Sequence, residues 1–272
     1  MAHRFLKMHG LGNDFVVFDT RERALAMTPA RARAIADRHT GIGCDQLILI
    51  EPSAIATAKM RIFNSDGGEV EACGNATRCV ATLLGDGARI ETLGGLLDAE
   101  VTAGGASVDM GAPRFDWDAV PLAYAMDTAA LPLAWDGLEP IAPPMALSVG
   151  NPHIIFFVPD TSALDLASIG PGIEHDPLFP ERINVNVATI ESRDRIRLRV
   201  WERGAGLTLA CGTGACATAV AAIRSGRVDS GVTVALPGGD LVIDWRLGGS
   251  IRMTGPAAHV FSGELDLDAF AP

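Results

Sequence analysis

Two cysteines occur in the same short motif at a long separation. Cys73 and Cys211 each stand in Ala-Cys-Gly, 138 residues apart. Each motif precedes a segment whose apolar pattern predicts a helix, so each thiol is expected at a helix N-terminus. There the unpaired N–H groups and the positive end of the helix dipole lower a thiol pKa from its ordinary ~8.5. We therefore predict two reactive thiols.

The residues after these cysteines, Gly74-Asn75 and Gly212-Thr213, place backbone N–H groups where a carboxylate could bind. If both helix starts face one cleft, a thiol stands on each side of the carbon that bears this carboxylate. One thiolate would remove the α-proton, the opposite thiol would protonate the other face, and the N–H groups would stabilise the developing charge. The pattern therefore favours inversion of a stereocentre.

The same offset relates several other segments of the chain. It aligns Arg61-Ile62-Phe63 with Arg199-Val200-Trp201, Gly12-Asn13 with Gly150-Asn151, and Gln46 with Asn184. A repeat of this length indicates two copies of one structural unit. We expect an N-terminal domain formed by residues 1–114 with the return of 260–272, and a C-terminal domain formed by residues 115–259.

The elements that must position these residues can be read from periodicity. Alternation predicts strands at residues 15–18, 46–50, 60–63, 154–158, 196–201 and 241–245. Thr28-Pro29 predicts a helix start, with a helix running toward His39. Further helices are expected from Cys73 to Gly85 and from Cys211 toward Ile223, the second buried on every side.

Two further segments complete the expected organisation. Residues 112–144 carry six prolines, which favours a segment that connects the domains over a core element. The tail after Met253 alternates like a short strand and is expected to return to the first domain. We predict an α+β fold of two pseudo-symmetric domains, each a curved mixed β-sheet or barrel around a central helix.

Composition restricts the class of partner and the cofactor. The net charge of −11 and the pI near 4.9 argue against binding to nucleic acid or anionic lipid. Five cysteines without C-x-x-C spacing indicate reduced thiols in a cytoplasmic protein, with no disulfides or zinc site, and no transmembrane segment is evident. The only lysines, Lys7 and Lys59, lack the context of a pyridoxal site, so no cofactor or metal is expected.

The motifs together resemble those of the diaminopimelate epimerase family, whose members are cofactor-independent enzymes of lysine and peptidoglycan-precursor synthesis. The resemblance rests on segments spread over nearly the whole chain: HGLGNDF (9–15), GIGCDQLI (41–48), FNSDGGEVEACGNATRC (63–79), GNPH (150–153), Asn184-Val185 and WERGAGLTLACGTGACA (201–217). It implies epimerisation of L,L-diaminopimelate to the meso isomer, and the family suggests a homodimer.

The resemblance also implies roles for individual residues. Cys73 and Cys211 would transfer the protons, with His153 and Glu202 placed to assist them. The small-molecule substrate, a diamino-dicarboxylic acid, would be bound by Asn13, Gln46, Asn64, Gly74, Asn75, Asn151, Asn184, Glu202, Arg203, Gly212 and Thr213. One position departs from the family pattern, since Leu207 replaces a usual acidic residue. This puts polar support at that position in doubt.

Other functions remain open from the sequence. A proline or hydroxyproline racemase would also use two thiols, but its substrate lacks the distal charges that Glu202 and Arg203 could recognise. A cysteine-dependent acyl-transfer enzyme, with one thiol activated by His153, would leave the second duplicated cysteine unexplained. A noncatalytic amino-acid binding protein would need neither thiol.

Overall fold

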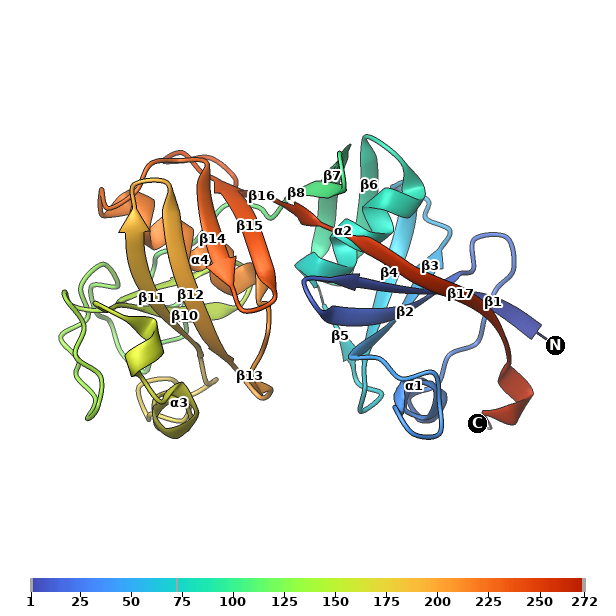
Figure 1. Cartoon of the computed structure of the whole chain (residues 1–272), viewed down its shortest axis with the longest axis horizontal. Helices are drawn as coiled ribbons and strands as arrows, with labels where there is room; N and C mark the ends of the chain where they lie inside the picture. Colours follow the sequence, from blue (N-terminus) through green and yellow to red (C-terminus); the bar gives the residue numbers. More distant parts are fainter. Residues whose placement is uncertain (1, 72, 271–272) are drawn as a thin grey trace. The chain divides into compact units, whose positions relative to one another are not determined.

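The structure is a computed structural model that describes residues 2–71 and 73–270. The chain divides into two compact units, one formed by residues 1–109 with 254–272 and the other by residues 110–253. These bounds lie a few residues from the predicted ones, because strand pairing in the first unit continues to Asp109 and resumes at Thr254. Ala72, within the first Ala-Cys-Gly motif, lies outside the described residues. Figure 1 shows the elements of each unit.

The first unit is a mixed sheet with two α-helices. Its helices are α1 (Pro29–Ala36), α2 (Gly74–Leu84) and the short η2 (Leu267–Ala269). Its strands are β1 (Ala2–Gly10), β2 (Asn13–Asp19), β3 (Gln46–Glu51), β4 (Ala58–Asn64), β5 (Glu69–Val70), β6 (Ala88–Thr92), β7 (Gly95–Thr102), β8 (Gly105–Asp109) and β17 (Ala258–Asp266), joined by the end of β16 (Arg252–Pro256). Strand β17 pairs antiparallel with β1, so the C-terminal strand belongs to this unit.

The second unit repeats this arrangement. Its helices are η1 (Thr161–Ala163), α3 (Leu166–Glu174) and α4 (Gly212–Arg224). Its strands are β9 (Met145–Ser148), β10 (Pro152–Phe157), β11 (Asn184–Ser192), β12 (Arg195–Glu202), β13 (Gly206–Leu207), β14 (Val232–Leu236) and β15 (Gly239–Asp244). With these elements the chain has the predicted α+β class.

The offset seen in the sequence also relates the strand pairing of the two units. Phe15 pairs with Gln46 in a parallel ladder, and the residues 138 positions later, His153 and Asn184, pair in the same way. The first residues of α2 and α4 are 138 positions apart, and so are the last residues of α1 and α3. The same residue positions therefore occupy equivalent places in two units of like topology.

Local sequence explains where the helices begin and how deeply they are buried. Thr28 accepts a hydrogen bond from the Arg31 N–H as the cap of α1, and Gly85 at φ 96° ends α2, both as predicted. Helix α4 consists largely of Ala, Gly, Thr and Val and packs against strands β9 to β12, β14 and β15. Ten of its thirteen residues are buried, which confirms the predicted central helix.

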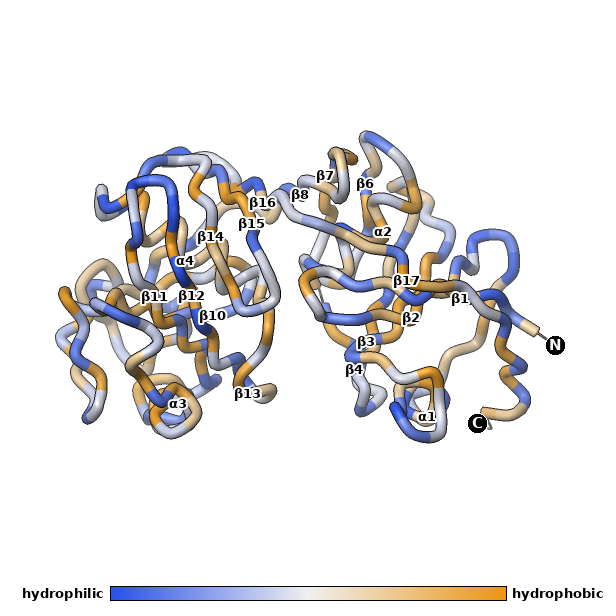
Figure 2. Tube along the Cα trace, viewed as in Figure 1, coloured by the Kyte–Doolittle hydropathy of each residue, from blue (hydrophilic) through white to orange (hydrophobic). Residues whose placement is uncertain are grey.

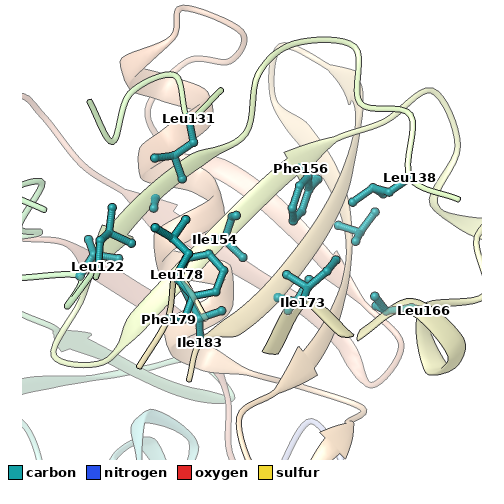
Figure 3. Packing of buried hydrophobic residues seen from close by; sticks show 14 of the residues in the cluster. Leu122, Leu131, Leu138, Ile154, Phe156, Leu166, Ile173, Leu178, Phe179 and Ile183 are labelled. Atoms are coloured by element: carbon teal, nitrogen blue, oxygen red, sulfur yellow. The ribbon is translucent and has the colours of Figure 1, made fainter. Parts of the chain in front are cut away.

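The proline-rich segment differs from the prediction, because it belongs to the core of the second unit. Val120, Leu122, Leu131 and Leu138 are buried against residues of β10 and β11 (Figure 3). Backbone hydrogen bonds fix the segment, among them Leu131 N to Pro144 O at 2.9 Å. Prolines exclude a regular strand here, but the apolar residues between them still gain free energy by leaving water.

The first unit has its own core between α1 and the strands. Ala32, Ile35 and Ala36 of α1 pack on apolar side chains of β2 and β3, and hydrophobic residues recur along these strands (Figure 2). Among the described residues, no helix has the length and apolar character needed to cross a membrane.

Candidate active site

Cys73 lies at the start of α2 with an extended backbone, φ −147°, and is half-buried. Its Sγ stands 3.7 Å from Asn13 Oδ1, which also accepts a hydrogen bond from Asn75 Nδ2 at 3.3 Å. Asn13 begins β2 after a tight turn in which Leu11 and Gly12 both have positive φ, a hairpin geometry that suits glycine. Three predicted site residues are thus brought together at the helix start.

Gln46 and Asn64 form a second pair in the first unit. They lie opposite each other on β3 and β4, and Gln46 Nε2 donates to Asn64 Oδ1 at 2.9 Å. Gln46 Oε1 is buried and has no hydrogen-bond partner within the described part of the chain. A buried acceptor of this kind is costly unless it is paired, so it is suited to receive a donor from a ligand.

Asp45 orients Asn13 and was not predicted as a site residue. Its Oδ2 accepts from Asn13 Nδ2 and from the Asp14 N–H, each at 3.0 Å. Asp14 in turn binds Lys7 Nζ at 2.5 Å and Arg38 Nη2 at 2.6 Å. Asp45 directly precedes Gln46 in the sequence, and this position next to a predicted site residue could have identified it.

Cys211 begins α4 and is buried. Its Sγ accepts the Gly214 N–H at 3.3 Å and lies 3.6 Å from Thr213 Oγ1. Burial, together with the nearby Glu202, raises the pKa of Cys211 well above its ordinary value, although Thr213 and Gly214 act against this. The sequence-based expectation of a lowered pKa does not hold for this thiol, because desolvation outweighs the helix terminus.

Glu202 stands beside Cys211 at the end of β12. It interacts with the Cys211 thiol and accepts a hydrogen bond from the Thr208 hydroxyl. Burial raises the pKa of Glu202, which makes it a stronger proton acceptor than an exposed carboxylate. Leu207, the departure from the family pattern, is exposed on β13, and the polar contact at Glu202 comes from Thr208.

His153 is completely buried on β10 and is held on both sides. Its Nδ1 faces Asn186 Nδ2 at 3.1 Å, and its Nε2 faces Asn151 Oδ1 at 2.9 Å. Burial lowers the pKa of His153 to about 3, so the ring is neutral at pH 7. Because an amide NH₂ can only donate, Nδ1 is the acceptor and Nε2 carries the proton.

The remaining predicted residues of the second unit form a short network. Asn151 Nδ2 donates to Thr213 Oγ1 at 3.3 Å. Asn184 Nδ2 donates to Pro152 O at 2.8 Å, and its Oδ1 accepts the Arg203 N–H at 2.9 Å. The Arg203 guanidinium is exposed and reaches Glu181 O. Asn184 therefore positions the backbone next to Glu202.

Asn186 is a buried polar residue that the sequence interpretation missed. It lies two residues after Asn184 on β11, hence on the same strand face. The alternation Asn-Val-Asn-Val at 184–187 was the signal that could have revealed it. In contrast, Cys44, Cys79 and Cys216 are buried packing residues as expected, and burial raises the pKa of Cys44 and of Cys79 to about 12.

Comparison with known proteins identifies the family. The family model for diaminopimelate epimerase matches residues 5–115 and 145–260. The chain belongs to the diaminopimelate epimerase family. Curated diaminopimelate epimerases from Rhizorhabdus wittichii and Sphingopyxis alaskensis are 68% identical over 271 residues and 66% identical over 270 residues. These matches cover 99% of this chain and 98% and 100% of those proteins.

Solved structures extend the likeness of fold beyond this family. A phenazine biosynthesis protein of the PhzF family from Bacillus anthracis has a TM-score of 0.73 at 15% identity, covering 97% of this chain and 99% of that chain. A hydroxyproline epimerase from Agrobacterium vitis has a TM-score of 0.66 at 17% identity, covering 100% and 93%. At such identities the likeness concerns the fold alone.

Proposed function

We propose that this chain converts L,L-diaminopimelate to meso-diaminopimelate without a cofactor, in lysine and peptidoglycan-precursor biosynthesis. The observation that carries the proposal is the pair of thiols at equivalent helix starts, Cys73 of α2 and Cys211 of α4, in a chain of the diaminopimelate epimerase family. Each unit, as bounded in the sequence interpretation, would act as one epimerase domain and supply one thiol.

In this proposal one cysteine thiolate takes the α-proton of the substrate, and the other thiol protonates the resulting carbanion from the opposite face. The C–H electron pair stays on the α-carbon and is delocalised into the carboxylate. Backbone N–H groups of Gly74-Asn75 and Gly212-Thr213 would stabilise that charge. The net result is an inverted centre, with one thiol and one thiolate exchanged.

Glu202 and His153 would support Cys211 in different ways. Glu202, whose pKa is raised by burial, is placed to take the thiol proton from Cys211. His153 is neutral and bonded to Asn151 and Asn186, which favours a positioning role over proton transfer. This modifies the role that the family resemblance implied for the imidazole.

The other predicted residues would bind the substrate. The unpaired Gln46 Oε1 is suited to accept from a substrate ammonium, and the exposed Arg203 guanidinium is suited to a carboxylate. Asn13, Asn64, Asn151 and Asn184 would supply further amide contacts. Two ammonium and two carboxylate groups of a diamino-dicarboxylic acid match this polar set better than proline does.

The test is turnover of L,L-diaminopimelate in deuterium oxide. We expect deuterium at the inverted α-carbon, and at least ~10²-fold slower turnover by Cys73→Ser and by Cys211→Ser. Cys79→Ala and Cys216→Ala, on the same two helices, are matched controls and should stay within about twofold of wild type. Inversion without deuterium uptake would contradict the two-thiol mechanism.

Two alternative activities can be tested with the same purified protein. A racemase of proline or hydroxyproline would turn over those substrates and not L,L-diaminopimelate, whereas an acyl-transfer enzyme would form a thioester on one cysteine. We also propose a cytoplasmic location, which suits five cysteines held as thiols, and a homodimer. Sedimentation of the purified chain measures the second.

A further inference from the structure

Hydrogen bonds in the second unit run in one direction toward Cys211. Asn186 Nδ2 lies 3.0 Å from Ile154 O, 3.1 Å from His153 Nδ1 and 3.3 Å from Asn184 O. Its two protons serve the two nearest of these acceptors, so it donates to His153 Nδ1, which requires the ring proton on Nε2. His153 Nε2 then donates to Asn151 Oδ1 at 2.9 Å. The amide direction of Asn151 is thereby fixed, so that its Nδ2 donates to Thr213 Oγ1 at 3.3 Å.

The last step reaches the thiol. Thr213 Oγ1 accepts a hydrogen bond from Asn151, so its own hydroxyl can donate to Cys211 Sγ, 3.6 Å away. The Gly214 N–H donates to the same sulfur. Donors directed at sulfur favour the thiolate, in opposition to Glu202, which faces Cys211 from β12.

In the described part of the first unit, the equivalent asparagine, Asn13, has different hydrogen-bond partners. Asn13 is held by the Asp45 carboxylate, which accepts from Nδ2 and leaves Oδ1 facing Cys73 and Asn75. Phe15 occupies the position that corresponds to His153. The two equivalent asparagines therefore use opposite ends of the amide at the helix start: Asn13 presents Oδ1 to Cys73, whereas Asn151 presents Nδ2 to Thr213.

We propose that Asn186 is a positioning residue that fixes the Nε2–H tautomer of His153 and thereby directs the Asn151–Thr213 chain to donate to Cys211. Asn186 is completely buried on β11, and its side chain bonds to His153, Ile154 O and Asn184 O. The effect of Asn186 on catalysis rests on the proposed role of Cys211. The measurements below use no substrate, so they succeed or fail independently of the proposed function.

The first measurement is ¹⁵N NMR of the histidine rings at pH 7. We expect wild-type His153 to be neutral with its proton on Nε2. The Asn151→Leu variant should keep that tautomer, because Asn186 still donates to Nδ1. A protonated ring, or a proton on Nδ1 in either protein, would overturn the proposal. Asn151 is only half-buried in a turn, so this variant should not unfold the unit.

The second measurement is a mutant cycle on Cys211 thiolate formation. In a Cys73→Ser background, the absorbance at 240 nm between pH 8 and 11 is compared with that of Cys73→Ser/Cys211→Ser, which cancels the Tyr124 signal. We expect Thr213→Val to raise the pKa of Cys211 by about 1, because one hydrogen bond is lost. Asn186→Leu should raise it in the same direction.

The double variant decides between positioning and a general structural effect. With Thr213→Val already present, Asn186→Leu should change the pKa of Cys211 by less than about 0.3, since the chain is already cut. An equal shift in both backgrounds would overturn the proposal. If Asn186→Leu does not fold, Asn151→Leu replaces it in the cycle, and the tautomer measurement still tests Asn186.

Discussion

His153 is completely buried and Glu202 is half-buried, and desolvation moves their pKa values in opposite directions. Burial raises the pKa of Glu202 and lowers the pKa of His153 to about 3, because desolvation disfavours the charged form of each. At neutral pH the histidine therefore carries no charge, while Glu202 remains the nearby group that can take a proton from Cys211. Glu202 is therefore suited to accept a proton, and His153 to position its neighbours.

Replacing Glu202 by glutamine tests this division. We expect Glu202→Gln to reduce turnover about 10²-fold, since the proton acceptor is lost. The pKa of Cys211 should fall, because the carboxylate that helps to raise it is gone. For wild type, activity should decline with falling pH through a value above the ordinary ~4.3 of glutamate. Rate profiles and absorbance at 240 nm measure these effects, with Glu181→Gln, an exposed neighbour, as the control.

Asp14 gives a prediction about stability and pH. Burial alone would raise its pKa, but hydrogen bonds from Arg38 and Lys7 hold it well below the ordinary value. The stabilisation is therefore complete above the unfolded pKa of ~3.9 and is lost as pH falls through the folded pKa. We expect Asp14→Asn to reduce the free energy of unfolding by about 2–4 kcal/mol at pH 7, leaving Lys7 without its ion partner.

Urea unfolding at pH 7 and at pH 3 measures the Asp14 effect. The difference between Asp14→Asn and wild type should shrink at the lower pH, because the Asp14 carboxylate of the unfolded wild-type chain is then largely protonated while that of the folded chain is still ionised. Asp98→Asn, which removes an exposed ion pair with Arg89, is the control and should change stability by less than ~1 kcal/mol. A difference that grows on acidification would contradict this account.

At the scale of elements, the starts of α2 and α4 are equivalent but packed differently. A Cβ on Gly214 would lie 2.6 Å from Asn186 Oδ1 and 3.2 Å from Cys211 Sγ. The corresponding residue of α2 is Ala76, which is fully buried. Helix α4 therefore approaches β11 too closely for the methyl group that α2 accommodates.

We predict that Gly214→Ala destabilises the protein by about 1–3 kcal/mol through overpacking and lowers turnover, because it displaces Asn186 or Cys211. Gly172→Ala is the matched control. Gly172 lies in α3 with open space at its Cβ, so alanine should stabilise by about 0.4–1 kcal/mol. Thermal unfolding and initial rates measure both. Unchanged stability and activity in Gly214→Ala would contradict the prediction that the close approach of α4 to Asn186 matters.

The sequence predicted these elements where a local signal was strong. Thr28-Pro29 marked the start of α1, and the repeated Ala-Cys-Gly marked both site helices. It did not predict the burial of Leu131, because the prolines around it indicate a connecting segment, whereas the segment packs in the core without forming a regular strand. Nor did it show the contact of Asn186 with His153, which depends on strand register, or the raised pKa of Cys211, which depends on tertiary burial.

At the scale of the whole molecule, the first unit is formed from both ends of the described chain. Strand β17 pairs with β1 along nearly its full length, and Leu267 enters the core of that unit. The second unit is a continuous segment, residues 110–253. The two units therefore depend differently on the C-terminal residues.

Truncation after Ala257 tests this dependence. We expect loss of the folded first unit, because β1 loses its antiparallel partner and the core loses Leu267, and consequently loss of turnover. Hydrogen exchange should show exposed amides in β1 and β2, with α4 still protected. Val260→Thr, an exposed substitution that keeps the backbone pairing, should change stability by less than ~0.5 kcal/mol. Protection of β1 in the truncated chain would contradict the prediction.

The return of β17 also sets the order in which the units can form during translation. Strand β1 leaves the ribosome before β17, and all of the second unit is synthesised between them. Domains commonly fold in the order in which they are synthesised. The second unit can therefore fold before β17 is available to complete the first. Until β17 is synthesised, the edge of β1 that pairs with it remains unpaired.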